Sequence, residues 1–304
     1  SSSGCFVFSR QATMPRHVTV ATTQMACVTD PESNFENLEA LIRDAAAAGA
    51  DVVVLQELPL LPYFCKDTKS VLFGLATPIE GNRFIERFSK IAAELRVVIP
   101  FSFFERANNA YYSSVVMIDA DGTLLGVYRK SHLPNGPGRQ EKYYFAPGDS
   151  GLRVFPTLHG RIGIALGWDA WFPEAARVLA LQGAELIVFP SAMGGEPRDT
   201  GRDMKAHWQR VVQGHAGANF MPCIVSNRVG TEQGTCGPVT FYGGSFLTGP
   251  EGDILAEADR TERSVLTAVY DLDKLAVERA NWGAFRDRRP DLYSSVLTLD
   301  GGRD

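Results

Sequence analysis

The segment DVVVLQ, residues Asp51–Gln56, constrains the fold more than any other part of the sequence. Its consecutive valines and leucine leave no polar face, so a strand formed here must be covered on both sides. Glu185–Phe189, with the sequence ELIVF, is a second run of this kind. Strands covered on both faces are typical of proteins in which helices pack on a sheet. We therefore expect an α/β fold.

Segments with strand and helix patterns alternate along the rest of the chain. Two short apolar runs flank the turn Ala120-Asp121-Gly122, which predicts a hairpin. Helices are expected at Asn34–Ala48, Arg83–Arg96, Pro173–Gln182 and Met204–Asn219, and further strands at His17–Ala21, Val97–Phe101, Ile162–Leu166, Pro222–Ser226, Gly244–Leu247 and Val265–Tyr270. No linker-like or repetitive stretch divides the chain. We expect one domain over residues 14–304, preceded at residues 1–13 by vector sequence or an N-terminal extension.

Composition excludes several functional classes. The chain of 304 residues is 45% hydrophobic, which excludes disorder, and its net charge of −5 provides no basic field for nucleic acid or an anionic membrane. No apolar run approaches the ~20 residues of a membrane span. The five cysteines are widely spaced without a CxxC pair, which favours a reducing, cytoplasmic location. No metal, nucleotide or flavin motif occurs, so we expect no cofactor.

The strongest functional feature is the turn that follows the predicted strand Ile162–Leu166. The strand runs into Gly167-Trp168-Asp169, and a helix is expected from Pro173. This is the shape of a nucleophile elbow, which presents a side chain at its apex beside free backbone N–H groups. The apex here is Gly167, which has no side chain. From the residues alone, a turn that binds a nucleotide or another anion is an equal alternative.

Three charged residues lie where an active site could use them. Glu57 ends the DVVVLQ strand and could be a general base or a solvated strand-end residue. Lys130 follows the hairpin and could stabilise an oxyanion or lie on the surface. Glu141 stands among basic and aromatic residues, a weak signal by itself. His132 and His215 are interpreted as structural.

Together these segments resemble the nitrilase, or carbon–nitrogen hydrolase, superfamily. The similarity extends from about His17 to Gly301. Short stretches carry it: Leu55–Leu58, Pro62–Cys65, Tyr128–His132, Gln140–Phe145, Trp168–Asp169 with Trp171–Arg177, His207–Arg210, Gln213–Asn219, Ser226–Arg228 and Phe285–Tyr293. The resemblance implies a four-layer α-β-β-α sandwich that assembles as a homo-oligomer, a dimer or larger.

The resemblance also implies a Glu-Lys-Cys mechanism. Glu57 would be the general base, and Lys130 would stabilise the tetrahedral oxyanion. Glu141 would position Lys130 and the substrate. The backbone N–H of Trp168 would complete the oxyanion hole.

This chain departs from the family at the nucleophile, because the family cysteine aligns with Gly167. Removal of a nucleophile costs on the order of a million-fold in turnover in other hydrolases, so we expect the chain as written to be catalytically dead. Cys65 and Cys223 are interpreted as structural. An engineered knockout and a natural inactive paralogue would both account for Gly167. Three further departures favour divergence or a redesigned pocket: Pro59-Leu60 for the family Phe-Glu, Ala170 for Gln and Gly195 for Ser.

The motifs are most similar to those of family members that hydrolyse N-carbamoylputrescine to putrescine, carbon dioxide and ammonia, a step of polyamine biosynthesis. Members that act on carbamoyl amino acids have an arginine just after the cysteine, and Ala170 and Trp171 fill that region here. A cationic amine tail is therefore favoured, with Glu196 as a candidate partner or a turn-exposed carboxylate. Trp171 could form the pocket wall or belong to the core. The absence of a family Glu at Leu60 weakens the putrescine assignment.

Two alternative functions remain open at this point. One is a non-catalytic ligand-binding or regulatory paralogue, and the other is an amidase for a different ureido or amide substrate. The small-molecule carbamoyl amine is the expected ligand in the first interpretation.

Overall fold

The computed structural model describes residues 16–199 and 201–302, so the expectation for residues 1–13 lies outside the described residues. Two sheets face each other. The first has the strand order β16-β1-β2, and a bridge from Val52 to Val98 continues it to β3-β4-β5. The second has the order β15-β14-β11-β10-β9-β8. The strands of the first sheet are β1 (His17–Gln24), β2 (Val52–Val54), β3 (Ile99–Ala107), β4 (Ala110–Ile118), β5 (Leu124–Arg129) and β16 (Ser264–Asp271). Those of the second are β8 (Arg153–Thr157), β9 (Gly160–Ile164), β10 (Leu186–Pro190), β11 (Cys223–Ser226), β14 (Phe246–Thr248) and β15 (Ile254–Glu257).

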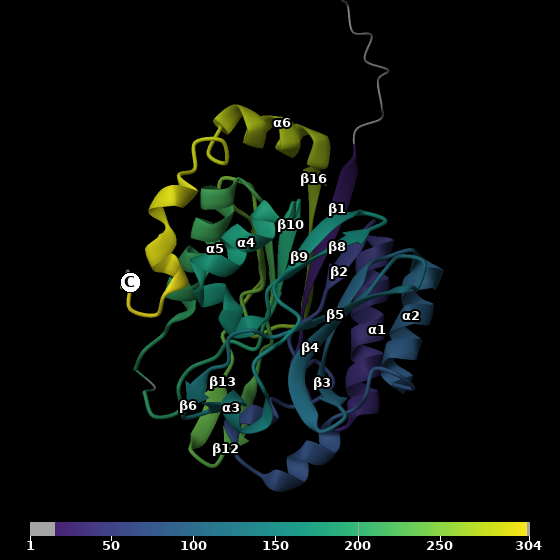
Figure 1. Cartoon of the computed structure of the whole chain (residues 1–304). Coiled ribbons are helices and arrows are strands. Elements are labelled where there is room, and N and C mark those ends of the chain that lie inside the picture. Colours follow the sequence, from purple (N-terminus) through teal and green to yellow (C-terminus); the bar gives the residue numbers. More distant parts are fainter. Residues whose placement is uncertain (1–15, 200, 303–304) are drawn as a thin grey trace, which may run out of the picture.

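Helices cover the outer faces of both sheets. Helices α1 (Pro31–Ala47) and α2 (Arg83–Leu95) lie beside the first sheet, at the right of Figure 1, and α4 (Pro173–Leu181) and α5 (Lys205–Asn219) cover the second at the left. The chain is thus a four-layer α-β-β-α sandwich, as the family resemblance implies. Helix α6 (Leu272–Trp282) follows β16 at one end of the sandwich (Figure 1).

Strand β2 shows how the sequence specifies these layers. Val52 and Val54 pack with residues of the second sheet in the core between the two sheets. Val53 points to the opposite side and packs with apolar residues of α1 and α2. Successive side chains of a strand point to opposite faces, so a strand between two apolar layers needs an apolar residue at every position.

Polar side chains fix the first residues of two helices. Asp30 accepts a hydrogen bond from the Ser33 backbone N–H at 2.9 Å, and Pro31 occupies the first turn, so α1 begins before the predicted Asn34. Asn82 accepts bonds from the N–H groups of Phe84 and Ile85 at the start of α2. The cap explains why α1 extends further toward the N-terminus than the apolar spacing alone indicates.

The structure differs from the sequence prediction at the ends of several elements and in elements that the sequence did not indicate. Strand β9 ends at Ile164, and the elbow is a 3-10 helix, η3 (Gly167–Trp171), rather than a simple turn. Strand β3 extends to Ala107 because it pairs with β4 over nine residues, a tertiary contact that periodicity does not show. Helix α6, strands β8 and β15 and several short elements have no matching prediction. The short elements are η1 (Phe64–Lys66), η2 (Ser70–Leu75), β6 (Asn135–Gly136), β7 (Arg139–Gln140), α3 (Glu141–Tyr144), β12 (Thr231–Gly234), β13 (Gly237–Thr240), η4 (Pro290–Leu292) and η5 (Ser294–Leu297).

Hairpins and short helices gather at one end of the sandwich, the lower end in Figure 1, where β6, α3, β12 and β13 lie. Among the described residues, no helix is long and apolar enough to cross a membrane.

Candidate active site

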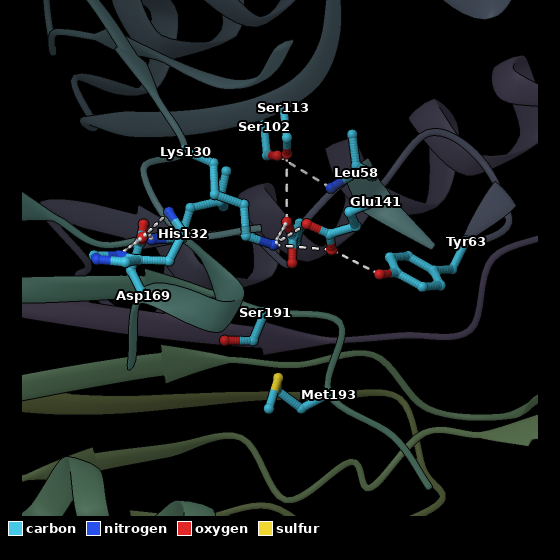
Figure 2. Close-up of polar contacts among 12 residues, drawn as sticks. Leu58, Tyr63, Ser102, Ser113, Lys130, His132, Glu141, Asp169, Ser191 and Met193 are labelled. Atoms are coloured by element: carbon cyan, nitrogen blue, oxygen red, sulfur yellow. Dashed lines mark hydrogen bonds and ion pairs between the residues drawn. The ribbon is translucent and has the colours of Figure 1, made fainter. Parts of the chain in front are cut away.

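Three buried charged side chains meet beyond the ends of the strands. Glu57 follows β2, Lys130 follows β5, and Glu141 is the first residue of α3. The Lys130 Nζ lies 2.8 Å from Glu57 Oε1 and 2.7 Å from Glu141 Oε2. Each of the three residues is at most 2% exposed. Figure 2 shows the Lys130 ammonium next to Glu141, with Tyr63 on the far side of that carboxylate. The structure therefore brings together the three charged residues singled out in the sequence.

The protonation of this cluster follows from one buried cation between two carboxylates. Burial lowers the pKa of Lys130, but Glu141 and Glu57 outweigh burial and raise it above its ordinary value. Burial raises the pKa of Glu141 to about 7, and Glu57 adds to this effect, while Lys130 and the Tyr63 hydroxyl oppose it. Lys130 is thus a fixed cation, whereas Glu141 changes its charge near neutral pH.

Arg228 holds the backbone that carries Glu57. Its Nη2 donates to the carbonyl oxygens of Glu57 at 2.8 Å and Leu58 at 2.9 Å, and its Nη1 donates to Glu232 Oε1 at 2.9 Å. Leu58 has a φ of 49°, in the left-handed region, and its N–H donates to Ser102 Oγ at 3.1 Å. Arg228 is 0% exposed. It lies in a stretch that carries the family resemblance, but no local signal indicates that its side chain is buried beneath the site.

Gly167 faces the same cluster. Its φ of 49° lies in the left-handed region, which glycine adopts freely and residues with a side chain adopt only with strain. A Cβ built on Gly167 would lie against Glu57 Oε2 and 2.9 Å from Lys130 Nζ. Any side chain at this position would therefore project between the carboxylate and the ammonium group.

Hydrogen bonds of Asp169 link the elbow to the segment around Lys130. Its Oδ2 accepts hydrogen bonds from the Leu166 N–H at 2.9 Å and the Tyr128 hydroxyl at 2.6 Å. Its Oδ1 accepts from the His132 N–H at 3.0 Å and lies 2.7 Å from His132 Nδ1 (Figure 2). Asp169 is 0% exposed. His132 is thus part of a structural network, in line with its sequence interpretation, whereas the sequence offered no role for Asp169.

His215 also has a structural contact. Its Nε2 lies 2.8 Å from the carbonyl oxygen of Ala170, and burial lowers its pKa, which favours the neutral ring. Ala170 is completely buried under α5. This position therefore belongs to the packing behind the elbow.

A small cavity of about 150 Å³ opens beside Trp168, the residue after Gly167. Trp171 and Glu196 line it too, so the three residues named from the sequence as substrate contacts share one pocket. The other lining residues are Arg139, Met193, Gly194, Asp199, Arg202, Met204 and Tyr242. Leu60 does not belong to this set. It lines a separate cavity of about 280 Å³ among phenylalanines, so an acidic residue there would stand apart from Glu196.

The two cysteines considered as replacement nucleophiles, Cys65 and Cys223, are poorly suited to lose their thiol protons. Cys65 and Cys223 are both 0% exposed. Burial raises the pKa of the Cys65 thiol well above its ordinary value, and Glu141 adds to this effect. Burial alone raises that of Cys223. Since the thiolate is the reactive form, both side chains suit a packing role.

No group of three or more histidine, cysteine or acidic side chains among the described residues has an arrangement that could hold a metal ion.

Comparisons with known proteins identify the family of the chain. Residues 19–279 match the family described as Carbon-nitrogen hydrolase. The chain is 54% identical over 291 residues to an N-carbamoylputrescine amidase of Solanum lycopersicum, with 94% of this chain and 97% of that protein covered. It is 46% identical to a citrullinase of Francisella tularensis subsp. tularensis over 281 residues, with 92% and 98% covered.

A crystal structure of a carbon–nitrogen hydrolase from Helicobacter pylori G27 superposes with a TM-score of 0.86 at 36% identity, covering 93% of this chain and 99% of that one. Family match, relatives and fold agree over nearly the whole length. The chain belongs to the carbon–nitrogen hydrolase family.

Proposed function

We propose that this chain has the active site of an N-carbamoylputrescine amidase, which cleaves N-carbamoylputrescine to putrescine, carbon dioxide and ammonia, and that Gly167 disables it. The observation that carries the proposal is the direction of the missing Cβ of Gly167, which leads to Glu57 and lies 2.9 Å from Lys130 Nζ. A sulfur atom attached there would have a carboxylate to accept its proton and a cation beside it. The relatives named N-carbamoylputrescine amidase support the substrate.

Each charged residue has a distinct step in the proposed mechanism. With cysteine at position 167, Glu57 accepts the thiol proton and the thiolate attacks the carbamoyl carbon. Lys130 and the Trp168 N–H stabilise the tetrahedral oxyanion, and Glu57 returns the proton to the departing ammonia. Water, activated by the same carboxylate, then releases the carbamate of putrescine, which loses carbon dioxide. Glu141 keeps Lys130 in place throughout.

Glycine at position 167 stops this sequence before its first bond forms. The chain retains the base, the cation and the pocket, but no thiol is available to attack. Removal of the nucleophile lowers turnover in other hydrolases on the order of a million-fold, which places turnover of this chain below ordinary detection.

The test is ammonia release from N-carbamoylputrescine by the Gly167→Cys variant, with the unchanged chain as the blank. Gly167→Ser provides a matched control, because it adds a Cβ and a hydroxyl but no thiol. Activity confined to the cysteine variant would support the elbow, the triad and the substrate together. A Gly167→Cys protein that folds but releases no ammonia would overturn the proposal.

A second candidate is a non-catalytic ligand-binding or regulatory paralogue. The intact cluster of Glu57, Lys130 and Glu141 next to an empty nucleophile position favours it, because such a site can hold a ureido compound without consuming it. A related possibility is a different ureido or amide substrate. N-carbamoylputrescine and citrulline share a terminal ureido group, and a relative is named citrullinase. Binding of these compounds to the unchanged chain, measured by calorimetry, separates a binding protein from a collapsed site.

We further propose a homo-oligomer, a dimer or larger, in the cytoplasm. Large apolar side chains of the C-terminal segment support association: Trp282 is 70% exposed and Leu297 88%. Light scattering that gives the mass of a single chain would contradict it. Among the described residues, the four cysteines Cys27, Cys65, Cys223 and Cys236 form no disulfide with one another, which supports a reducing compartment.

A further inference from the structure

We propose that Glu232, a carboxylate of the hairpin β12–β13, is a positioning residue that keeps both carboxylates of the Lys130 cluster in place. The inference rests on the proposed function, because the geometry that Glu232 would maintain is that of the general base Glu57 and of Glu141. It extends that function to a hairpin that belongs to neither of the two main sheets.

The side chain of Glu232 points inward from this hairpin. Its neighbours Thr231 and Gln233 are exposed, whereas the Glu232 side chain is only 11% exposed. This alternation is expected for successive residues of a strand. Val239, which lies opposite Glu232 in the pairing of β12 with β13, is buried in the same apolar cluster as Tyr63. Removing a carboxylate from water is costly unless the group is paired and hydrogen-bonded, so the partners of Glu232 indicate its role.

The first partner of Glu232 leads to Glu57. Glu232 Oε1 accepts a hydrogen bond from Arg228 Nη1 at 2.9 Å, and Arg228 Nη2 donates to the carbonyl oxygens of Glu57 and Leu58. Among the residues that the structure describes, Glu232 is the only carboxylate within ion-pair distance of Arg228, and Arg228 Nε has no hydrogen-bond partner. The orientation of the guanidinium group therefore depends on its Nη bonds, of which Glu232 provides the charge-assisted one.

The second partner leads to Glu141. Glu232 Oε2 accepts a hydrogen bond from the Tyr63 backbone N–H at 2.7 Å, and the Tyr63 hydroxyl donates to Glu141 Oε1 at 2.6 Å. Figure 2 shows the Tyr63 ring on the side of Glu141 that faces away from Lys130. Lys66 Nζ also donates to Glu232 Oε2, at 2.9 Å. The two oxygens of Glu232 thus connect, each through one intermediate residue, to the two carboxylates that flank the Lys130 ammonium group.

The backbone at Glu57 needs such support. Leu58, the next residue, has a φ of 49°, a left-handed conformation that a leucine adopts only with strain. Arg228 bonds the carbonyl oxygens on both sides of this strained position. A displacement of about 1 Å in an active site lowers a rate on the order of a hundredfold. A Glu57 that is no longer fixed should therefore lower kcat and leave KM largely unchanged.

The experiment measures kcat and KM for ammonia release from N-carbamoylputrescine in the Gly167→Cys background, with and without Glu232→Gln. The amide keeps the shape of the side chain but removes its charge and replaces one accepting oxygen by a donor. We expect kcat to fall at least about tenfold, with KM within about threefold. A smaller fall in kcat, or a loss confined to KM, would overturn the inference.

Asp67→Asn is the matched control. Asp67 is 6% exposed and accepts a hydrogen bond from the Thr235 N–H of the same hairpin at 2.6 Å, but it forms no hydrogen bond with Arg228 or Tyr63. The substitution also converts a buried carboxylate to an amide, and kcat should stay within about twofold. An equal fall of kcat in the two variants would assign the effect to any weakening of the hairpin and would overturn the role of Glu232.

A second variant separates positioning from charge balance. Glu232→Gln leaves Arg228 and Lys66 as buried cations without a carboxylate, which by itself destabilises the fold. Lys66→Met added to Glu232→Gln removes one of these charges, and circular dichroism reports whether the protein is folded. In the Gly167→Cys background its kcat should still be at least about tenfold low, because Arg228 and Tyr63 lack their acceptor. Recovery of kcat would overturn the inference, since unbalanced charge would then be the cause.

Crystal structures of the unchanged chain and of its Glu232→Gln variant test the positioning without catalysis. We expect the bond from Arg228 to the Glu57 carbonyl to be lost, and the distance of 2.8 Å between Lys130 Nζ and Glu57 Oε1 to change by more than about 0.5 Å. Unchanged geometry would overturn the inference. An inactive Gly167→Cys chain together with a displaced Glu57 in the variant removes only the proposed function. An active Gly167→Cys chain whose kcat does not depend on Glu232 removes only the present inference.

Discussion

The Glu57 carboxylate stands in the path that a side chain of Gly167 would take. The position of a Cβ on Gly167 falls against Glu57 Oε2, with Lys130 Nζ 2.9 Å away. The relationship has two consequences. In the proposed function it is the reason why a nucleophile at position 167 would meet Glu57 as its base, and it means that any side chain added there requires the carboxylate to shift.

We expect Gly167→Ala to lower the free energy of unfolding by about 1–3 kcal/mol. An alanine at φ of 49° is strained, and its methyl group crowds the buried Glu57 carboxylate. Denaturant unfolding measures the change. Gly195→Ala is the matched control, because the nearest heavy atom to its Cβ is 3.8 Å away and its φ is not left-handed, so its effect should stay within about 0.5 kcal/mol. Equal effects of the two substitutions would contradict the strain at the elbow.

The pKa of Glu141 predicts a pH dependence of stability. Burial raises this pKa from 4.5 to about 7, so the folded chain holds a proton that the unfolded chain has already released between these values. The contribution is full below pH 4.5 and is lost as the pH rises to about 7. Relative to Glu141→Gln, the parent chain should lose on the order of 3 kcal/mol between pH 4.5 and 8.

Thermal or denaturant unfolding of both proteins across this pH range measures the difference, in which the other titrating groups cancel. Glu36→Gln, at an exposed position of α1, serves as the control and should follow the parent curve. A parent curve parallel to that of Glu141→Gln would show that Glu141 does not titrate in this window.

Replacement of Lys130 by methionine should destabilise the fold by about 3–5 kcal/mol. The substitution keeps a long, unbranched side chain but leaves Glu57 and Glu141 as two buried carboxylates without a cation. The loss should shrink at pH 5, where Glu141 is protonated, and in the double variant with Glu141→Gln. Lys142→Met removes an exposed lysine nearby and should change stability by less than about 0.5 kcal/mol. A Lys130→Met loss that is the same at pH 5 and pH 8 would show that the carboxylates are not its cause.

We expect Asp169→Asn to loosen the elbow. Both carboxylate oxygens of Asp169 accept hydrogen bonds, among them those from Tyr128 and His132. An amide replaces one of these oxygens by an NH2 group, which donates and cannot accept, so the bonds to that oxygen are lost. The expected cost is about 2–4 kcal/mol of unfolding free energy. In the Gly167→Cys background, kcat for ammonia release should fall at least tenfold with KM within about threefold, because the pocket residues Glu196 and Trp171 are untouched. A loss confined to KM would contradict a role in positioning the elbow.

Local chemistry in the sequence determined the layers of the fold. Val52, Val53 and Val54 leave a strand no polar face, which requires an apolar layer on each side. The side chains of Asp30 and Asn82 accept hydrogen bonds from backbone N–H groups only two or three residues further along the chain. These bonds fix the first turns of α1 and α2. These signals are short-range, so the central strands and the helices α1, α2, α4 and α5 could be predicted, whereas α6, β8, β15 and the end of β3 could not.

The charged residues of the candidate site were also visible in the sequence, but mainly through family resemblance. Glu57, Lys130 and Glu141 are each ambiguous alone, because a carboxylate or an ammonium at a strand end is often solvated. Only the tertiary structure shows that all three are buried and within hydrogen-bond distance, which sets the pKa values of Lys130 and Glu141.

The remaining features depend on contacts between segments distant in sequence. Arg228 lies beneath the Glu57 backbone, 171 residues away, and its burial has no signature in its neighbours. Arg139 and Arg202 meet at one pocket although the segment next to Gly167 contains no arginine. The sequence by itself determined which strands need cover on both faces, where four of the helices lie and that residue 167 has no side chain. The tertiary structure decided which charges share a low-dielectric site and which line the pocket beside Trp168, because these energies depend on distance and burial rather than on chain order.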